Sequence, residues 1–290
     1  MRMAKIENVQ FIIPVPGQSY TDIRPVISGE DWKDIRQTAQ ELAYGVGNKK
    51  MGDLLSGKEE RHTEPLTSLQ TMGDGVLFNK DAHTYQKDGN EYISGSTFAH
   101  KFEAEFPREY IAKKVAEKDS RTVEDVLEGW NSKGEISLQY GTLIHKCMET
   151  YIKYGEMPNN EYLKGIVTDW ADQTSYENCE SELFVQNDAR RMCGIVDLLV
   201  KDKKTSLIDF KTGDIYQKMK LNSHKDDWNQ DRFQLYTLQL NFYKYILEQS
   251  GTKVDEMIIW WLNGDVWEKV EVPKMDNFVS VLEEVWNPSK

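Results

Sequence analysis

The stretch that decides the fold is CGIVDLLVKDKKTSLIDFKT, residues 193–212. Two apolar segments, 193–201 and 205–212, flank the polar turn Asp202-Lys203-Lys204, and this pattern predicts two adjacent β-strands. Charged residues nevertheless interrupt both segments: Asp197 in the first, and Asp209 and Lys211 in the second. Burying an unpaired charge costs roughly several kcal/mol, so these charges need a specific reason to be there.

The pairing register decides whether the two acids meet. Residues two apart in a strand share a face, so Asp209 and Lys211 point the same way. A three-residue loop pairs residue 201 with 205, and therefore places Asp197 opposite Asp209. A loop of two or four residues places Asp197 opposite Ile208 or Phe210, on the wrong face. A shared site therefore requires an odd loop or a bulge.

Two neighbouring carboxylates and a lysine have a recognisable chemistry. The carboxylates repel each other unless a cation lies between them or one of them is protonated. A hard divalent ion such as Mg²⁺ accepts carboxylate oxygens, and a lysine beside it can act on a water or on a phosphate. This combination suggests phosphodiester hydrolysis. Taken alone, the Asp-Phe-Lys tripeptide is better explained as a half-exposed strand carrying a surface ion pair.

The pattern along the rest of the chain predicts a mixed α/β (α+β) fold, with a central mixed β-sheet flanked by helices. Residues 1–75 form an N-terminal extension that is partly helical, and residues 76–290 form one domain. Helices are expected over these residues: 30–44, 96–106, 108–118, 123–132, 137–155, 161–174, 231–249 and 275–285. Strands are expected within 76–94, with a turn at 88–90, and over these residues: 181–186, 193–201, 205–212, 257–262 and 266–272.

Two predicted helices carry polar residues at regular spacing. Gly141, His145 and Glu149 are four residues apart and share one helix face, and Gln239 and Tyr243 lie one turn apart on a later helix. Each group by itself is also explained by ordinary packing and hydrogen bonding. The signal is their order along the chain: a glycine–histidine–glutamate helix, two strands with acids, and a glutamine–tyrosine helix.

This ordered series resembles the RecB-type branch of the PD-(D/E)XK nuclease superfamily. The elements that match are G-x-x-x-H-x-x-x-E, G-x-x-D beginning at Gly194, D-x-K, and Q-x-x-x-Y, and they span residues 140–247. That branch includes recombination exonucleases, CRISPR adaptation nucleases and many phage exonucleases. The resemblance implies a restriction-endonuclease-like core with helical N-terminal additions. The second acid of the family is often glutamate, and here it is Asp209.

The resemblance also implies the metal ligands. These are the side chains of His145, Asp197 and Asp209 and the backbone carbonyl of Phe210. The expected cofactor is Mg²⁺ or Mn²⁺, of which Mn²⁺ accepts imidazole more readily, and both ions are expected to support activity.

The other site residues follow from the same resemblance. Lys211 corresponds to the catalytic lysine, which acts with Asp197 and Asp209. Gln239 and Tyr243 are expected to hold the DNA strand or to support the site. Glu149 and Glu182 are candidate acids of the outer shell.

The function expected from these residues is a metal-dependent deoxyribonuclease, an exonuclease of recombination, repair or phage DNA processing. Two alternatives remain open: a catalytically inactive nucleic-acid-binding module of the same fold, and an RNA-directed nuclease. The expected partner is DNA, joined by a helicase, a single-strand annealing protein or further copies of the chain. The net charge of −12 argues against a protein whose whole surface binds DNA.

Composition excludes several other classes of protein. The three cysteines, Cys147, Cys179 and Cys193, are too few and too widely spaced for a disulfide framework, a zinc knuckle or a four-cysteine iron–sulfur cluster. No apolar run approaches the roughly 20 residues of a membrane helix, and we expect no signal peptide. The expected location is therefore the cytoplasm, that of the host if the chain is phage-encoded.

Overall fold

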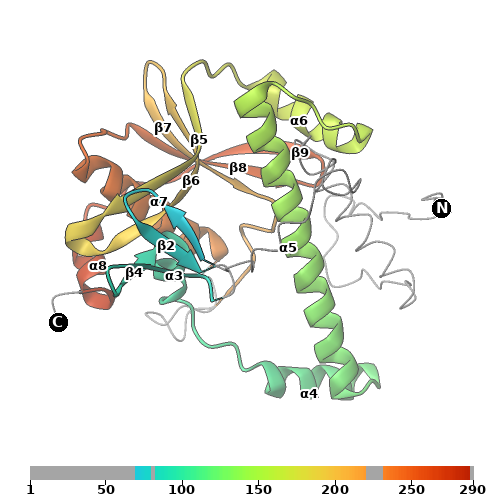
Figure 1. Cartoon of the computed structure of the whole chain (residues 1–290). Helices are drawn as coiled ribbons and strands as arrows, with labels where there is room; N and C mark the ends of the chain where they lie inside the picture. Colours follow the sequence, from blue (N-terminus) through green and yellow to red (C-terminus); the bar gives the residue numbers. More distant parts are fainter. Residues whose placement is uncertain (1–68, 80–81, 220–230, 288–290) are drawn as a thin grey trace, which may run out of the picture.

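The computed structural model describes residues 69–79, 82–219 and 231–287. The helix predicted over residues 30–44 lies outside them. Within the described part, the chain has the predicted mixed α/β fold, with nine strands in one mixed sheet and six α-helices. Figure 1 shows the sheet with helices on both of its faces. The fold class predicted from the sequence is therefore confirmed.

The nine strands follow the predicted segments closely, with β1 as an addition. β1 lies before the predicted boundary at residue 76 and pairs with β2. The turn predicted at 88–90 joins β3 to β4, and Asp88 and Gly89 both adopt the left-handed backbone that such a tight turn needs. The strands are β1 (Leu69–Met72), β2 (Val76–Asn79), β3 (Thr84–Lys87), β4 (Asn90–Ser94), β5 (Cys179–Asn187), β6 (Met192–Lys201), β7 (Thr205–Lys211), β8 (Glu256–Asn263) and β9 (Val266–Glu271).

Most of the helices also begin and end near the predicted residues. The earliest one is shorter than predicted, because it ends at His100 and not at residue 106. The helices are α3 (Gly95–His100), α4 (Arg108–Asp119), α5 (Val123–Tyr154), α6 (Glu161–Gln173), α7 (Arg232–Gln249) and α8 (Phe278–Val285).

One helix prediction is wrong. The helices expected over 123–132 and 137–155 are a single helix, α5, of 32 residues. A capping box between Thr122 and Asp125 begins it, and Gly155 in the left-handed conformation ends it. The residues between the two predictions include Gly134, but an isolated glycine costs a helix only about 1 kcal/mol, which is too little to break it.

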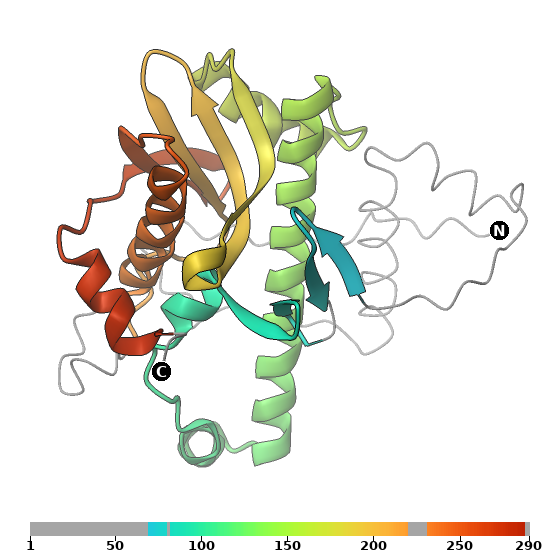
Figure 2. The ribbon, with the colours of Figure 1, turned by 60° about the vertical axis from the view of Figure 1, so that its left-hand side comes forward.

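The core has two layers, one on each face of the sheet. On one face, Leu207, Met257 and Ile259 pack under α7, together with residues of α3 and α8. On the other face, Ile208 and Trp260 pack against α5 and α6. This alternation follows from the two-residue period of strands that are buried on both faces. Figure 2 shows α7 and α8 on one side of the strands and α5 on the other.

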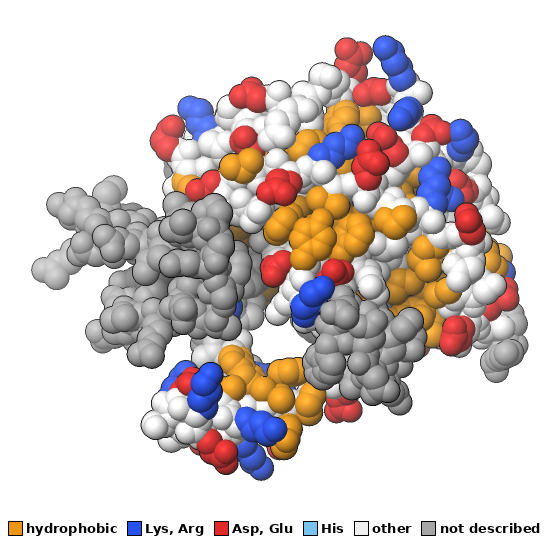
Figure 3. All heavy atoms as spheres, turned by 180° about the vertical axis from the view of Figure 1, so that it is seen from behind, with side chains coloured by type: hydrophobic (Ala, Val, Ile, Leu, Met, Phe, Trp, Pro, Cys, Tyr) orange, Lys and Arg blue, Asp and Glu red, His pale blue; other side chains and the backbone are white. Residues whose placement is uncertain are grey.

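The N-terminal half of α5 projects away from the sheet with α4 beside it (Figures 1 and 2). These two helices are joined by a small cluster of buried residues, Ala112, Ala116 and Val126. In Figure 3 this projection carries lysine and arginine side chains next to hydrophobic ones. In the described part of the chain, no helix is both long enough and apolar enough to cross a membrane.

Candidate functional site

The strands β6 and β7 pair in the register that the three-residue loop predicts. Lys201 pairs with Thr205, and the ladder continues to Leu198 opposite Ile208. One further step would place Asp197 opposite Asp209, but the ladder stops before it. The Asp197 carboxylate instead accepts a hydrogen bond of 2.8 Å from the backbone N–H of Phe210. The predicted register is confirmed, and the two strands separate where their acids begin.

The separation follows from the neighbours of β6. β4 pairs in parallel with the start of β6, at Met192 and Cys193, while β7 pairs with its end, at 198–201. Residues 194–197 lie between these two ladders and form no described strand pair on that edge. The side chain of Asp197 occupies this opening. A gap between strands of one sheet therefore forms the site.

On its other edge, β6 pairs with β5 almost throughout. Ser181 pairs with Leu198 and Leu183 with Val196, which places Glu182 opposite Asp197. Glu182 has a φ of 53°, in the left-handed region. This conformation costs a residue with a side chain about 1–2 kcal/mol, and such strain is often found at functional sites.

The His145 side chain connects α5 to this opening. Its Nε2 lies 2.8 Å from the carbonyl oxygen of Phe210, and its Nδ1 lies 3.5 Å from Oδ2 of Asp197. A carbonyl oxygen only accepts, so Nε2 donates this hydrogen bond. In the neutral ring, the Nδ1 lone pair then faces a carboxylate, which is stable only with a proton or a cation between them.

Glu182 joins these two residues. Among the described residues, the set of potential ligand atoms that lie within 4.8 Å of one another comes from His145, Glu182 and Asp197. Burial raises the pKa of Glu182 to about 7, and repulsion from Asp197 and Glu149 adds to this effect. Three elements, α5, β5 and β6, therefore bring one imidazole and two carboxylates together.

Asp209 and Lys211 form an ion pair beside this set. Lys211 Nζ lies 2.5 Å from Oδ2 of Asp209, and both side chains are largely buried. Burial raises the pKa of Asp209, although Lys211 opposes it. Burial alone would lower the pKa of Lys211, but the attraction of Asp209 and Asp197 outweighs it and raises this pKa. At neutral pH, the lysine is therefore charged and held towards the acids.

The residues of α7 hold this ion pair in place. Nε2 of Gln239 lies 3.5 Å from Oδ1 of Asp209, and the ring of Tyr236 lies 4.7 Å from Lys211 Nζ in a cation–π contact. Tyr243, one turn from Gln239, is buried. Its ring packs against Gly194 and Gly95, where an added Cβ would lie 2.6 Å and 2.7 Å from ring atoms.

The glycines of the predicted pattern thus have a steric explanation. Gly194 leaves space for the Tyr243 ring, and a Cβ at Gly141 would lie 3.2 Å from Oγ1 of Thr212. Both positions allow a helix to approach the strands closely. Glu149 lies on the same helix as His145 but is paired with Lys146 and Lys153 at 2.9 Å and 2.8 Å. Burial alone would raise its pKa, and these two ion pairs outweigh it and lower the pKa.

The structure therefore brings together most of the predicted site residues, but the positions of two acids differ from those predicted. Glu182, predicted as an outer acid, lies within the set formed with His145 and Asp197, whereas the Asp209 carboxylate is engaged by Lys211. The assignments of Asp209 and the Phe210 carbonyl as metal ligands stay predictions. Sequence reasoning missed Tyr236, whose one available signal was its place three residues before Gln239 on the same helix.

The donor set fits a divalent cation. One potential ligand atom from each of His145, Glu182 and Asp197 lies within 4.8 Å of the other two. Because Nε2 of His145 donates to the Phe210 carbonyl, the neutral ring keeps its lone pair on Nδ1, which faces the Asp197 carboxylate. Carboxylates with an imidazole suit Mn²⁺, and the carboxylates suit Mg²⁺. Burial is the main cause of the raised pKa of Glu182, and repulsion from Asp197 and Glu149 adds to it; a cation would offset this repulsion.

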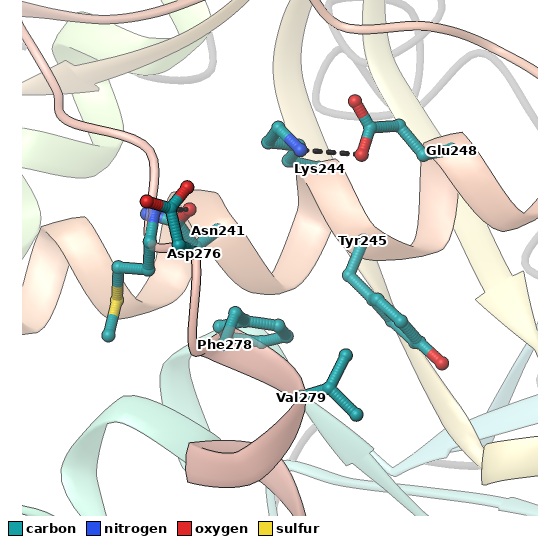
Figure 4. Close-up of a pocket in the computed structure, with 8 residues that line it drawn as sticks. Asn241, Lys244, Tyr245, Glu248, Asp276, Phe278 and Val279 are labelled. Atoms are coloured by element: carbon teal, nitrogen blue, oxygen red, sulfur yellow. Dashed lines mark hydrogen bonds and ion pairs between the residues drawn. The ribbon is translucent and has the colours of Figure 1, made fainter.

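A hollow of about 140 Å³ lies between α7 and α8 (Figure 4). Three of its polar side chains already have partners. Lys244 pairs with Glu248 at 2.5 Å, and Asn241 bonds to the backbone of Pro273 and Met275. This hollow therefore offers a ligand few free polar groups, and we assign it no function.

Comparisons with known proteins add little to this geometry. No family model matches the chain, and no curated protein matches it. One solved structure that is similar in part is titled "Crystal structure of SSO0001". It is 13% identical, with a TM-score of 0.31, and the match covers 68% of this chain and 74% of that one. A similarity at this level carries no conclusion about function.

Proposed function

We propose that this chain is a metal-dependent nuclease that hydrolyses phosphodiester bonds in DNA. The observation that carries the proposal is the meeting of His145, Glu182 and Asp197 within 4.8 Å, next to the buried pair of Asp209 and Lys211. Carboxylates and an imidazole are metal ligands, and a fixed lysine beside them suits a reaction in which negative charge develops on a phosphate.

The residues that would hold the metal are His145, Glu182 and Asp197, joined by Asp209 and the Phe210 carbonyl as the resemblance implies. A bound divalent ion would supply Lewis acidity towards the phosphate and would lower the pKa of a water. Lys211 would place a positive charge against the phosphate, because Asp209 and Tyr236 fix the direction of its side chain. Gln239 would hold the Asp209 carboxylate in turn.

The finer assignment is an exonuclease that acts in recombination, repair or phage DNA processing. It depends on the resemblance of residues 140–247 to RecB-type nucleases. The acidic net charge of −12 requires that binding be confined to one region of the surface, where the metal cancels the local carboxylates.

The test is hydrolysis of linear DNA, circular DNA and RNA, each with Mg²⁺, with Mn²⁺ and with EDTA. We expect linear DNA to be degraded with either metal, and circular DNA and RNA to persist. Asp197→Asn should abolish hydrolysis, since the amide keeps an oxygen for the Phe210 N–H but is a poor metal ligand. Asp172→Asn, on the exposed face of α6, is the matched control and should leave the rate unchanged.

The other outcomes separate the alternatives. Full activity of Asp197→Asn with linear DNA would contradict the proposed site. Degradation of RNA but not of DNA would indicate an RNA-directed nuclease. DNA binding without hydrolysis under any metal condition would indicate an inactive binding module.

A further inference from the structure

An exposed tyrosine, Tyr216, lies five residues after Lys211, the last residue of β7. The Tyr216 side chain is 46% exposed, although its backbone is well anchored. Its N–H is bonded to the Asp214 carboxylate at 2.9 Å, and its neighbour Ile215 is fully buried. The segment therefore inserts Ile215 into the protein and presents the next ring to solvent.

The Tyr216 ring does not stand alone. It meets the Trp261 ring edge-on, at 5.5 Å and 89°, and it lies 6.0 Å from the Phe233 ring. Trp261, on β8, is half-buried. Fixed aromatic rings with one open side are the usual means by which proteins hold nucleobases.

This aromatic group is continuous with the candidate site. Trp261 pairs with Lys211 in the parallel ladder of β7 and β8, so the two side chains emerge side by side on the same face of the sheet. Phe233 lies one turn before Tyr236 on α7, and Tyr236 contacts Lys211 Nζ. Arg232 lies beside Tyr236 and adds a second positive charge. The aromatic rings therefore extend from Lys211 to the solvent-exposed Tyr216.

We propose that Tyr216 and Trp261 form a stacking surface for one unpaired nucleobase of the strand whose phosphate lies at Lys211. The inference rests on the proposed nuclease function and deepens it by naming the substrate class. A base that stacks on a side chain has left its partner strand, so the substrate is single-stranded DNA or a frayed duplex end. Because every base has an aromatic face, the surface tolerates any sequence.

The test combines changes in the protein and in the substrate. Tyr216→Ala removes the aromatic ring, and Tyr216→Phe keeps it. Tyr216→Leu replaces the ring with an apolar side chain that is not aromatic. Tyr154→Ala is the matched control, because Tyr154 is 69% exposed and belongs to α5, on the opposite face of the sheet. Single-stranded oligonucleotides carry one abasic site, moved in turn through the positions around the cleaved bond, and kcat/KM is measured with Mn²⁺.

The expected result is a specific coupling between one base and one ring. With the wild-type protein, an abasic site at one position should lower kcat/KM about 10-fold. On the intact strand, Tyr216→Ala and Tyr216→Leu should also lower kcat/KM about 10-fold. For these two variants, the abasic site should lower kcat/KM little further, because the ring that the base contacts is already absent. Tyr216→Phe and Tyr154→Ala should behave as the wild type. Equal sensitivity of wild type and Tyr216→Ala to every abasic site would overturn the inference.

A binding experiment separates failure of this inference from failure of the proposed function. Fluorescence anisotropy of the same labelled oligonucleotides is measured with Ca²⁺ in place of Mn²⁺. Hydrolysis without base–ring coupling would refute the stacking surface and retain the nuclease. Base–ring coupling in binding, without any hydrolysis, would retain the surface and refute the nuclease. A wild-type protein that neither binds nor hydrolyses these strands would refute both.

Discussion

The two halves of β7 show how one short strand can serve both the core and the site. Thr205–Ile208 pairs with β6 on one edge, and most of it also pairs with β8 on the other. Asp209–Lys211 keeps only the pairing with β8 among the described strands, and its other edge faces the Asp197 side chain. The first half carries no charge and includes the fully buried Leu207 and Ile208, whereas the second half holds two charges.

The difference lies in the neighbouring strand and not in burial. Asp209 is as buried as much of the core, at 4% exposure. It is stable there because the parting of β6 and β7 leaves space for Asp197, Lys211 and Gln239 around it. A sheet that opens for a few residues thus places charges inside the protein without isolating them.

The largest effect is expected in the uncharged half. Leu207→Ala should lower the free energy of unfolding by about 2–5 kcal/mol, because the side chain is fully buried under α7. Hydrolysis per folded molecule should remain near that of wild type. Urea unfolding and an activity assay below the transition measure these two quantities. If Leu207→Ala were as stable as wild type but inactive, the first half of β7 would serve the site and not the core, contrary to the role assigned to it.

The charged half should show the opposite behaviour. Lys211→Met keeps the length of the side chain but removes its charge, so we expect the rate at saturating metal to fall about 100-fold or more. The affinity for Mn²⁺, measured by calorimetry, should be retained, because a protonated lysine offers no lone pair to a metal. Rescue of the rate by excess Mn²⁺ would show that Lys211 acts through the metal site instead.

An intermediate effect is expected where the opening meets α7. Gly194→Ala places a Cβ 2.6 Å from the Tyr243 ring, so β6 or α7 must move. Overpacking of this kind costs about 1–3 kcal/mol, and the shift should also lower activity because Gln239 lies on the same helix. Gly134→Ala, with open space around its Cβ, is the control and should be neutral or stabilising.

The smallest effect concerns Glu182 in the metal-free protein. Its pKa is about 7 in the folded protein and 4.5 ordinarily, so between these values the folded state keeps a proton that the unfolded chain has lost. Stability therefore falls as the pH rises from about 4.5 to 7, and the full penalty persists above pH 7.

Glu182→Gln removes this penalty and keeps the same backbone. In EDTA at pH 8, the variant should be more stable than wild type by about 1–2 kcal/mol. This is less than the whole pKa shift corresponds to, because the side chain is partly exposed and solvent screens its charge. Near pH 4.5 the two proteins should agree. Thermal unfolding across this pH range measures the difference. An advantage of the variant that is the same at pH 4.5 and at pH 8 would exclude titration of Glu182 as its cause.

Much of the strand framework follows from the sequence. The apolar segments on either side of a three-residue turn predict β6, β7 and the register that brings Asp197 towards Asp209. The spacing of His145 along α5 places it on the face with Gly141, which the structure brings close to Thr212. These features depend on neighbours in the chain, where periodicity and turn length act directly.

Other parts of the site were decided by the tertiary structure alone. Three features have no local signature: the left-handed backbone of Glu182, the parting of β6 from β7, and the ring of Tyr236 over Lys211. The contact of the Tyr216 ring with Trp261 has none either. They depend on contacts between distant residues, such as the bond between His145 and Phe210, which are 65 positions apart. Local sequence determined which residues share a strand or a helix face. Long-range packing decided which of those faces meet, because the contacts that offset backbone strain and buried charge exist only in the folded chain.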